Sequence, residues 1–240
     1  MSLNKILVII FFVIPGSCKV KRSEMQEVRS DIEYKLGNFD LVIEHLDKAI
    51  ELMPTNSRLY FKKANCLISL KKFQKALKVI NQSIELGEPT DLHYLKKAEI
   101  FLELDQKDSS FFYYDFSIRI SKKPERVYES RAKSNFKLGF IDFALSDINK
   151  AIQINPGYIE GYNTRGEIYY DSSEYEKAIP DFSYVIENSI DDKVLTGSAF
   201  VHRGGSYLKT GKLKLACEDW KMAVELGMNQ ATVLIDDFCN

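Results

Sequence analysis

The sequence predicts an all-α protein, a right-handed α-solenoid of about six helical hairpins with a C-terminal capping helix. Three observations predict this class. Helix-breaking residues are scarce, with 12 glycines and 6 prolines in 240 residues, against averages of about 7% and 5%. Apolar residues recur every third or fourth position, as one face of a helix requires. The whole pattern then repeats at intervals of 34 residues, which is typical of stacked-repeat architectures.

Composition and charge narrow the class of protein. Hydrophobic residues make up 45% and charged residues 28% of the chain, which is enough apolar material for a core and excludes a disordered protein. Lys and Arg total 33 against 34 Asp and Glu, a formal net charge of -1. This balance gives no electrostatic reason to expect a nucleic-acid partner.

Residues 1–17 have the features of an export signal. Residues 6–14 are nine consecutive apolar residues that follow Lys5. A helix of that length covers about half of a ~30 Å bilayer core, so it is too short for a transmembrane span. A basic start, a short apolar centre and small residues before a cleavage point are typical of a signal peptide. We expect residues 18–22 to form a linker to the folded domain.

The end of this segment resembles the lipobox of bacterial lipoproteins, in which a cysteine is lipidated and becomes the first residue. Ile14, Gly16, Ser17 and Cys18 fit that pattern, whereas Pro15 departs from it. The resemblance implies lipidation of Cys18 and a membrane-anchored protein of the cell envelope, in the periplasm or at the outer membrane. Ordinary cleavage after Ser17 or Cys18 is the alternative, and it predicts a periplasmic or secreted protein.

Several position series repeat in phase along the chain. One is aromatic, at Tyr60, Tyr94, Tyr128, Tyr162 and Phe200. Small residues follow four positions later, at Ala64, Ala98, Ala132, Gly166 and Gly204. A bulky series runs through Leu46, Ile80, Tyr114, Ile148, Phe182 and Trp220. Small residues allow two helix backbones to approach closely, and bulky residues fill the space between neighbouring pairs.

This pattern is similar to the tetratricopeptide repeat (TPR), a 34-residue helix–turn–helix unit. The best match, residues 125–158, has Tyr128, Ala132, Gly139, Ile148 and Pro156 in phase. The resemblance covers an array at 23–230, with units at 23–56, 57–90, 91–124, 125–158, 159–192 and 197–230. Because the end of a solenoid needs a cover with a polar outer side, we expect residues 229–240 to form a capping helix.

The fifth unit departs from the pattern. Pro180 stands inside its second helix, where it removes a hydrogen bond and should kink the helix. Four extra residues follow near Asp191 and Val194. We expect an irregular seam between units five and six, which is either a tolerated insertion or a widened groove or hinge.

Charged pairs sixteen residues apart recur in three units, as Arg131 with Asp147, Arg165 with Asp181, and Arg203 with Asp219. In a two-helix hairpin this spacing places one residue on each helix at matched height. Because each pair stays in its own unit, we interpret the pairs as structural and not catalytic. We expect partly exposed ion pairs, each contributing about 0–1 kcal/mol.

Two cysteines near the C-terminus are candidates for a disulfide. If the chain reverses near Gly227, two antiparallel helices bring Cys217 close to Cys239, and an exported protein meets an oxidising compartment. Two free thiols are the alternative, since disulfide geometry is demanding. We interpret Cys66 as a small buried apolar residue.

The sequence offers no candidate catalytic or metal-binding residues and implies no cofactor. His45, His93 and His202 occupy different places in their units, without metal-ligand spacing, and no nucleotide-binding, hydrolase or metalloprotease motif occurs. We therefore expect a protein without enzymatic activity or a small-molecule substrate.

The TPR resemblance implies a partner-binding surface. In such arrays the first helix of each unit lines a concave face, mainly one, five and eight residues beyond the aromatic position. Mixed aromatic, aliphatic and charged residues there suit a peptide or protein partner. The family's carboxylate clamp is incomplete, because Phe61 replaces its lysine. The implied partner-binding residues are Phe61, Asn65, Ile68, Leu95, Glu99, Leu102, Glu129, Lys133, Phe136, Asn163, Glu167, Tyr170, Val201, Gly205 and Leu208.

These features together predict a non-enzymatic interaction module or scaffold of the bacterial cell envelope, bound to the membrane by its N-terminal lipid anchor. The alternative is a structural subunit of an outer-membrane or pilus assembly complex, which rests on architecture alone.

Overall fold

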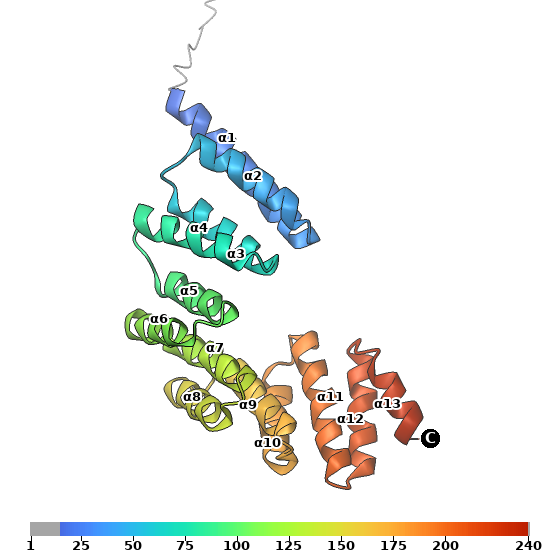
Figure 1. The fold of residues 1–240 in the computed structure, drawn as a ribbon. Coiled ribbons are helices and arrows are strands. Elements are labelled where there is room, and N and C mark those ends of the chain that lie inside the picture. The colour runs from blue at the N-terminus through green and yellow to red at the C-terminus, as the bar shows by residue number, and fades with distance from the viewer. Residues whose placement is uncertain (1–14, 240) are drawn as a thin grey trace, which may run out of the picture. The chain divides into compact units, whose positions relative to one another are not determined.

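A computed structural model describes residues 15–239, and these residues form α-helices and no strand (Figure 1). The all-α prediction is therefore confirmed. The apolar run at 6–14 lies outside the described residues, and residues 18–22, expected as a linker, belong to the first helix. The helices are α1 (Pro15–Leu36), α2 (Phe39–Leu52), α3 (Ser57–Ser69), α4 (Phe73–Leu86), α5 (Asp91–Glu103), α6 (Lys107–Ile120), α7 (Pro124–Lys137), α8 (Ile141–Ile154), α9 (Ile159–Asp171), α10 (Tyr175–Asn188), α11 (Lys193–Lys209), α12 (Leu213–Glu225) and α13 (Ala231–Phe238).

The turns between paired helices share one backbone conformation. In each, a residue one or two positions after the end of the first helix has a left-handed φ, which ranges from +55° at Lys71 to +79° at Gly139. The next N–H then bonds the carbonyl five residues back, as from Lys72 to Leu67 at 2.8 Å. This arrangement satisfies carbonyls at the helix end. The residues in this conformation are Gly37, Lys71, Asp105, Gly139, Ser173 and Gly211.

The described chain divides into two compact units, residues 15–113 and 114–239. In unit 1, bulky side chains of the second helices fill the space between hairpins. Val42 and Leu46 of α2 pack with Leu59 of α3. Ile80 of α4 packs with Ile100 of α5 in the next cluster. All five side chains are buried, so the core of unit 1 is a row of clusters, each between neighbouring helices.

Unit 2 repeats this packing with larger aromatic side chains. A Cβ atom on Gly166 would lie 2.9 Å from the ring of Phe182, and one on Gly204 would lie 2.6 Å from Nε1 of Trp220. Interiors are packed tightly enough that such an overlap forces the neighbouring atoms to shift. Glycine at 166 and 204 thus leaves room for Phe182 and Trp220, two of the largest fully buried side chains among the described residues.

The last helix covers the end of unit 2. The chain turns at Gly227, whose φ is +96°, and α13 packs on α12. Ala231 of α13 belongs to the buried cluster around Trp220. Cys217 of α12 and Cys239, which follows α13, form a disulfide with an S–S distance of 2.06 Å. The C-terminal segment is thus fixed both by apolar burial and by a covalent bond.

The seam between α10 and α11 differs from the other seams in the length of the helix that follows it. Helix α10 continues through Pro180. The four inserted residues extend α11 to 17 residues, against 13 in α9. Asp192 caps the extended helix by accepting hydrogen bonds from the N–H groups of Val194 and Leu195, at 3.1 and 3.0 Å. The insertion is accommodated because a capped helix gains one turn without disturbing its packed face.

Candidate partner-binding face

The implied binding residues stand at i, i+4 and i+7 on the first helices of the hairpins, so each trio lies along one side of its helix. We call the surface formed by these trios the first-helix face. In unit 1 it comes from α3 (Phe61, Asn65, Ile68) and α5 (Leu95, Glu99, Leu102). In unit 2 it comes from α7 (Glu129, Lys133, Phe136), α9 (Asn163, Glu167, Tyr170) and α11 (Val201, Gly205, Leu208).

Apolar members of the face are anchored in the core. Phe61 and Ile68 are half-buried against the cluster that contains Ile80, and the ring of Phe61 lies 4.4 Å from that of His93. Leu95 is buried outright. Each of these side chains is held in place by packing, so the face presents a preformed surface, which lowers the entropy cost of binding.

A hydrogen-bonded cluster organises the face in unit 2. Glu129 accepts hydrogen bonds from Thr164 at 3.0 Å, from Lys133 at 2.6 Å and from the hydroxyl of Tyr158. Burial, together with the hydrogen bond to Glu129, raises the pKa of Tyr158 above its ordinary value. The Glu129 carboxylate is therefore engaged on both oxygens and serves to brace α7 against α9.

Two asparagine oxygens on the face are buried and lack hydrogen-bond partners among residues 15–239. They are Oδ1 of Asn65 in unit 1 and Oδ1 of Asn163 in unit 2. The amide nitrogen of Asn163 donates to Glu167 at 2.7 Å, which fixes the orientation of this amide. Because buried polar groups are nearly always hydrogen-bonded, both oxygens are suited to accept a hydrogen bond from a bound partner or from water.

A pocket of about 270 Å³ adjoins Asn65 within unit 1. Its lining includes Tyr34 and Asp31 of α1 and Lys62 of α3, beneath which lie apolar side chains of α2. Sequence reasoning missed the α1 residues because Gln26 replaces the aromatic residue there. The same offsets would have found them, since Asp31 and Tyr34 are five and eight positions beyond Gln26.

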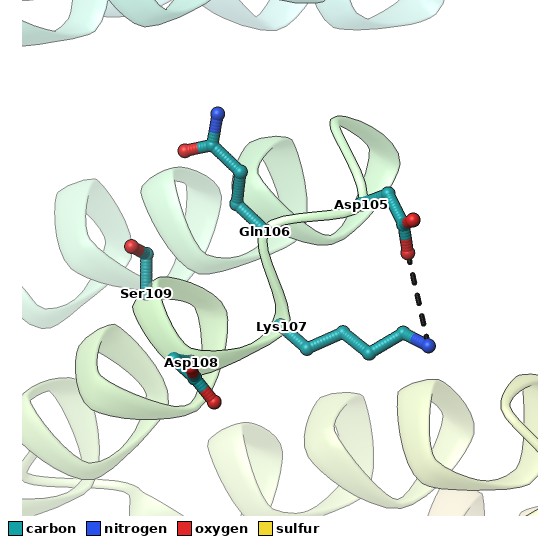
Figure 2. Close-up of a pocket in the computed structure, with 5 residues that line it drawn as sticks. All are labelled: Asp105, Gln106, Lys107, Asp108 and Ser109. Carbon is teal, nitrogen blue, oxygen red and sulfur yellow. Dashed lines mark ion pairs between the residues drawn. The ribbon is translucent and has the colours of Figure 1, made fainter.

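A second hollow, of about 490 Å³, lies at the turn from α5 to α6. Figure 2 shows the ammonium of Lys107 turned toward Asp105, at 3.7 Å, while Gln106, Asp108 and Ser109 point in other directions. All five lining residues come from one short segment of the chain. Their side chains do not converge, so this hollow has no arrangement suited to catalysis or ligand binding.

The arginine–aspartate pairs are structural, and they are partly exposed only through the arginines, which are 17–22% exposed. Asp147, Asp181 and Asp219 are 4–7% exposed. Arg165 donates to both oxygens of Asp181, at 2.8 and 2.7 Å. Each arginine also bonds the preceding hairpin, as Arg165 does at Asn149 at 2.7 Å. The close approach of the two helices covers the carboxylate, and these pairs lie in three separate hairpins.

Other candidate residues carry structural roles. Burial raises the pKa of the Cys66 thiol to about 11, so this cysteine stays protonated. Cys18 lies in α1 with a partly exposed side chain. Within the described part of the chain, no group of three or more His, Cys, Asp or Glu residues is placed to hold a metal ion. None of the described helices is both long and apolar enough to cross a membrane.

Comparison with known proteins agrees with this architecture. A family model described as tetratricopeptide repeat matches residues 33–99. Human tetratricopeptide repeat protein 13 is 32% identical over 114 residues, which are 47% of this chain and 13% of that protein. The Hsp70-Hsp90 organizing protein of Triticum aestivum is 36% identical over 70 residues, 29% of this chain and 12% of that protein. The chain thus spans a small part of the length of either relative.

Solved structures share the fold. PilW, a type IV pilus biogenesis factor, superposes with a TM-score of 0.66 at 13% identity, over 83% of this chain and 90% of that one. YrrB, a TPR protein with an unusual peptide-binding site, gives a TM-score of 0.53 at 18% identity, over 80% and 97%. The in-phase repeat, the helical hairpins and the family model lead to one conclusion: residues 33–99 match the tetratricopeptide repeat family, and the described chain has the fold of tetratricopeptide repeat proteins.

Proposed function

We propose that this protein is a non-enzymatic binding module of the bacterial cell envelope, which holds a partner peptide or protein on its first-helix face. TPR proteins mediate protein–protein interactions, and this fold generally serves as a scaffold and not as an enzyme. The observation that carries the proposal is the pair of buried, unpartnered acceptors, Asn65 Oδ1 and Asn163 Oδ1. In either unit, a backbone N–H group of a peptide docked there would satisfy the acceptor of that unit, between apolar side chains that are already ordered.

Export to the envelope is supported by two features. The segment at 1–17 has the pattern of a lipoprotein signal, and Cys18 would carry the lipid. The disulfide between Cys217 and Cys239 suits an oxidising compartment such as the periplasm, since disulfides rarely persist in the cytosol. Replacing Cys18 by Ala should release the protein from the membrane fraction; unchanged fractionation would contradict the lipid anchor.

Photo-crosslinking in the native cell tests the binding face. A photoreactive phenylalanine analogue at Phe61, Phe136 or Tyr170 should capture a discrete partner. The matched control is Phe143 of α8, which is 68% exposed and lies outside the first-helix face. Capture of the same protein at equal yield from Phe143 would show that the face is not the binding site.

Substitution of the two asparagines provides a second test, which asks whether the partner donates hydrogen bonds to their side-chain oxygens. Replacing both Asn65 and Asn163 by Ala removes two acceptors, each contributing about 1 kcal/mol if a partner donates to it. The crosslinking yield should then fall several-fold, while the protein keeps its helical content. An unchanged yield would mean that water, and not the partner, satisfies these oxygens.

The alternative function is that of a structural subunit in an outer-membrane or pilus assembly complex. The likeness to PilW concerns the fold and keeps this alternative open. Recovery of one stoichiometric, salt-resistant complex would favour the subunit. Weak or mixed partners would favour the interaction module.

A further inference from the structure

Helix α1 exposes an apolar stripe on the side that faces away from the rest of unit 1. Met25, Val28, Ile32 and Leu36 are 53%, 58%, 52% and 66% exposed. Their spacing of three, four and four residues places them along one side of the helix. We call these four residues the α1 stripe. The end of a helical array normally presents a polar side to water. We therefore expect another surface to cover the apolar side chains of the α1 stripe.

The opposite side of α1 is the one that packs against the array. Ser23 is buried there, and its hydroxyl donates to the carbonyl of Ala49 in α2 at 3.1 Å. Ser30 is buried on the same side. These small polar residues allow close approach to α2, so the apolar residues of α1 contribute little to the core of unit 1 and remain available at the surface.

Acidic and basic side chains lie on different sides of α1. Glu27 and Asp31 turn toward α3, where Lys62 pairs with both at 2.7 Å. Lys21, Arg29 and Lys35 are exposed and, at 100° per residue, lie within about 60° of the middle of the stripe. Glu24 and Glu33 stand further round the helix. The side that carries the stripe is therefore apolar with basic flanks.

We propose that the α1 stripe docks on the surface of a membrane that contains anionic phospholipid. An apolar stripe with flanking Lys and Arg is the pattern of a helix that lies in the membrane interface, with its basic side chains reaching the headgroups. Charge complementarity thus favours lipid over a second copy of the chain, because two basic stripes repel each other.

The position of α1 in the chain agrees with this occupant. In a chain that is lipidated at Cys18, the lipid is attached seven residues before Met25, about 10 Å along the helix axis. The α1 stripe supplies a contact with the membrane surface close to this anchor. This inference does not depend on what the first-helix face binds.

Two tryptophan variants of the full chain test the orientation directly. Ile32→Trp places the probe in the stripe, whereas Tyr34→Trp places it two residues away, on the side that lines the pocket near Asn65. Both are mixed with phosphatidylcholine vesicles, with or without phosphatidylglycerol, whose acyl chains carry a bromine quencher. Trp220 is 1% exposed and gives the same background in both variants.

We expect the Ile32→Trp emission to move to shorter wavelength and to be quenched in vesicles with phosphatidylglycerol, while that of Tyr34→Trp stays unchanged. Equal quenching of both probes would show that α1 lies near lipid without docking through the stripe, and would overturn the proposal. So would an unquenched Ile32→Trp probe. A blue shift that grows with protein concentration without vesicles would instead assign the stripe to a second copy.

Charge reversal separates the basic flanks from the stripe. Adding Lys21→Glu, Arg29→Glu and Lys35→Glu to the Ile32→Trp chain should weaken partitioning into the anionic vesicles at least tenfold. Unchanged partitioning would overturn the electrostatic part of the proposal. Far-UV circular dichroism of each variant checks that the fold is intact, since all the replaced side chains are exposed.

Discussion

Replacing Arg165 by Met should destabilise unit 2 far more than loss of a surface ion pair would. Arg165 is held by three hydrogen bonds, two to Asp181 and one to Asn149, and its guanidinium lies 5.4 Å from the centre of the Tyr162 ring. Methionine keeps the apolar stem of the side chain. The substitution therefore removes the charge and the donors with little loss of packing.

The magnitude follows from the burial of Asp181, which is 4% exposed. Burial raises the pKa of this carboxyl, and the hydrogen bonds from Arg165 oppose that shift. Breaking a buried pair by removing one partner costs about 3–5 kcal/mol, because the remaining charge is uncompensated. The side chain of Arg165 is 22% exposed, so water can partly replace it, and we expect about 3 kcal/mol.

Urea unfolding followed through Trp220 emission measures this effect, since Trp220 is buried in the same unit. With a slope of about 2 kcal/mol per molar, the midpoint should fall by about 1.5 M. The control is Lys177→Met, which breaks the exposed pair with Glu174 and should leave the urea midpoint almost unchanged, because water replaces an exposed ion pair. If the two variants lose the same stability, the buried-pair argument is wrong.

The pH dependence provides an independent check of the same reasoning. Without Arg165, the pKa of Asp181 in the folded state should rise further above its unfolded value. The carboxyl then takes up a proton on folding, and a neutral carboxyl is easier to bury. The deficit relative to the wild type should therefore shrink as the pH falls toward the ordinary aspartate range. A deficit that grows on acidification would contradict this account.

Three further predictions concern the turns, the histidine at α5 and the disulfide. Gly139→Ala should lower the free energy of unfolding by about 1 kcal/mol, because its φ is left-handed, and Lys71→Gly should raise it slightly for the same reason, as urea midpoints would show. Burial lowers the pKa of His93, so stability should fall as the pH drops below about 6.5; His93→Gln should reduce that dependence in thermal unfolding at pH 7.5 and 5.5. A reductant should cost about 2–4 kcal/mol by opening the 22-residue loop between Cys217 and Cys239, measured through Trp220, whereas the double Cys→Ser variant should be insensitive to reductant.

Most of the fold could be predicted because each signal is local and repeats. The spacing of Tyr128, Ala132 and Ile148, found again in neighbouring units, gives the positions of the helices without knowledge of the tertiary structure. Glycine predicted only some of the turns between paired helices. Gly37, Gly139 and Gly211 mark three of the turns, but Lys71 and Ser173 adopt the same left-handed backbone without any glycine. Tertiary packing imposes that conformation on them.

The features of the site that depend on burial could not be predicted from the sequence. The sequence implied the trios of the first-helix face, yet not that Asn65 and Asn163 leave buried oxygens without partners within the described chain. The pocket beside Tyr34 was missed because the first unit lacks its aromatic residue. The exposed stripe on α1 was missed for a related reason: apolar periodicity alone does not say which side of a helix meets its neighbour.

The sequence by itself determined the helices, their pairing in hairpins and the small and bulky positions between them, because these depend on residue size and spacing within about 34 residues. Tertiary structure alone decided the burial of Asp181, the choice between a disulfide and free thiols at Cys217 and Cys239, and the side of α1 left exposed. Those outcomes depend on which surfaces meet and exclude water, a property of neighbouring helices that no single segment encodes.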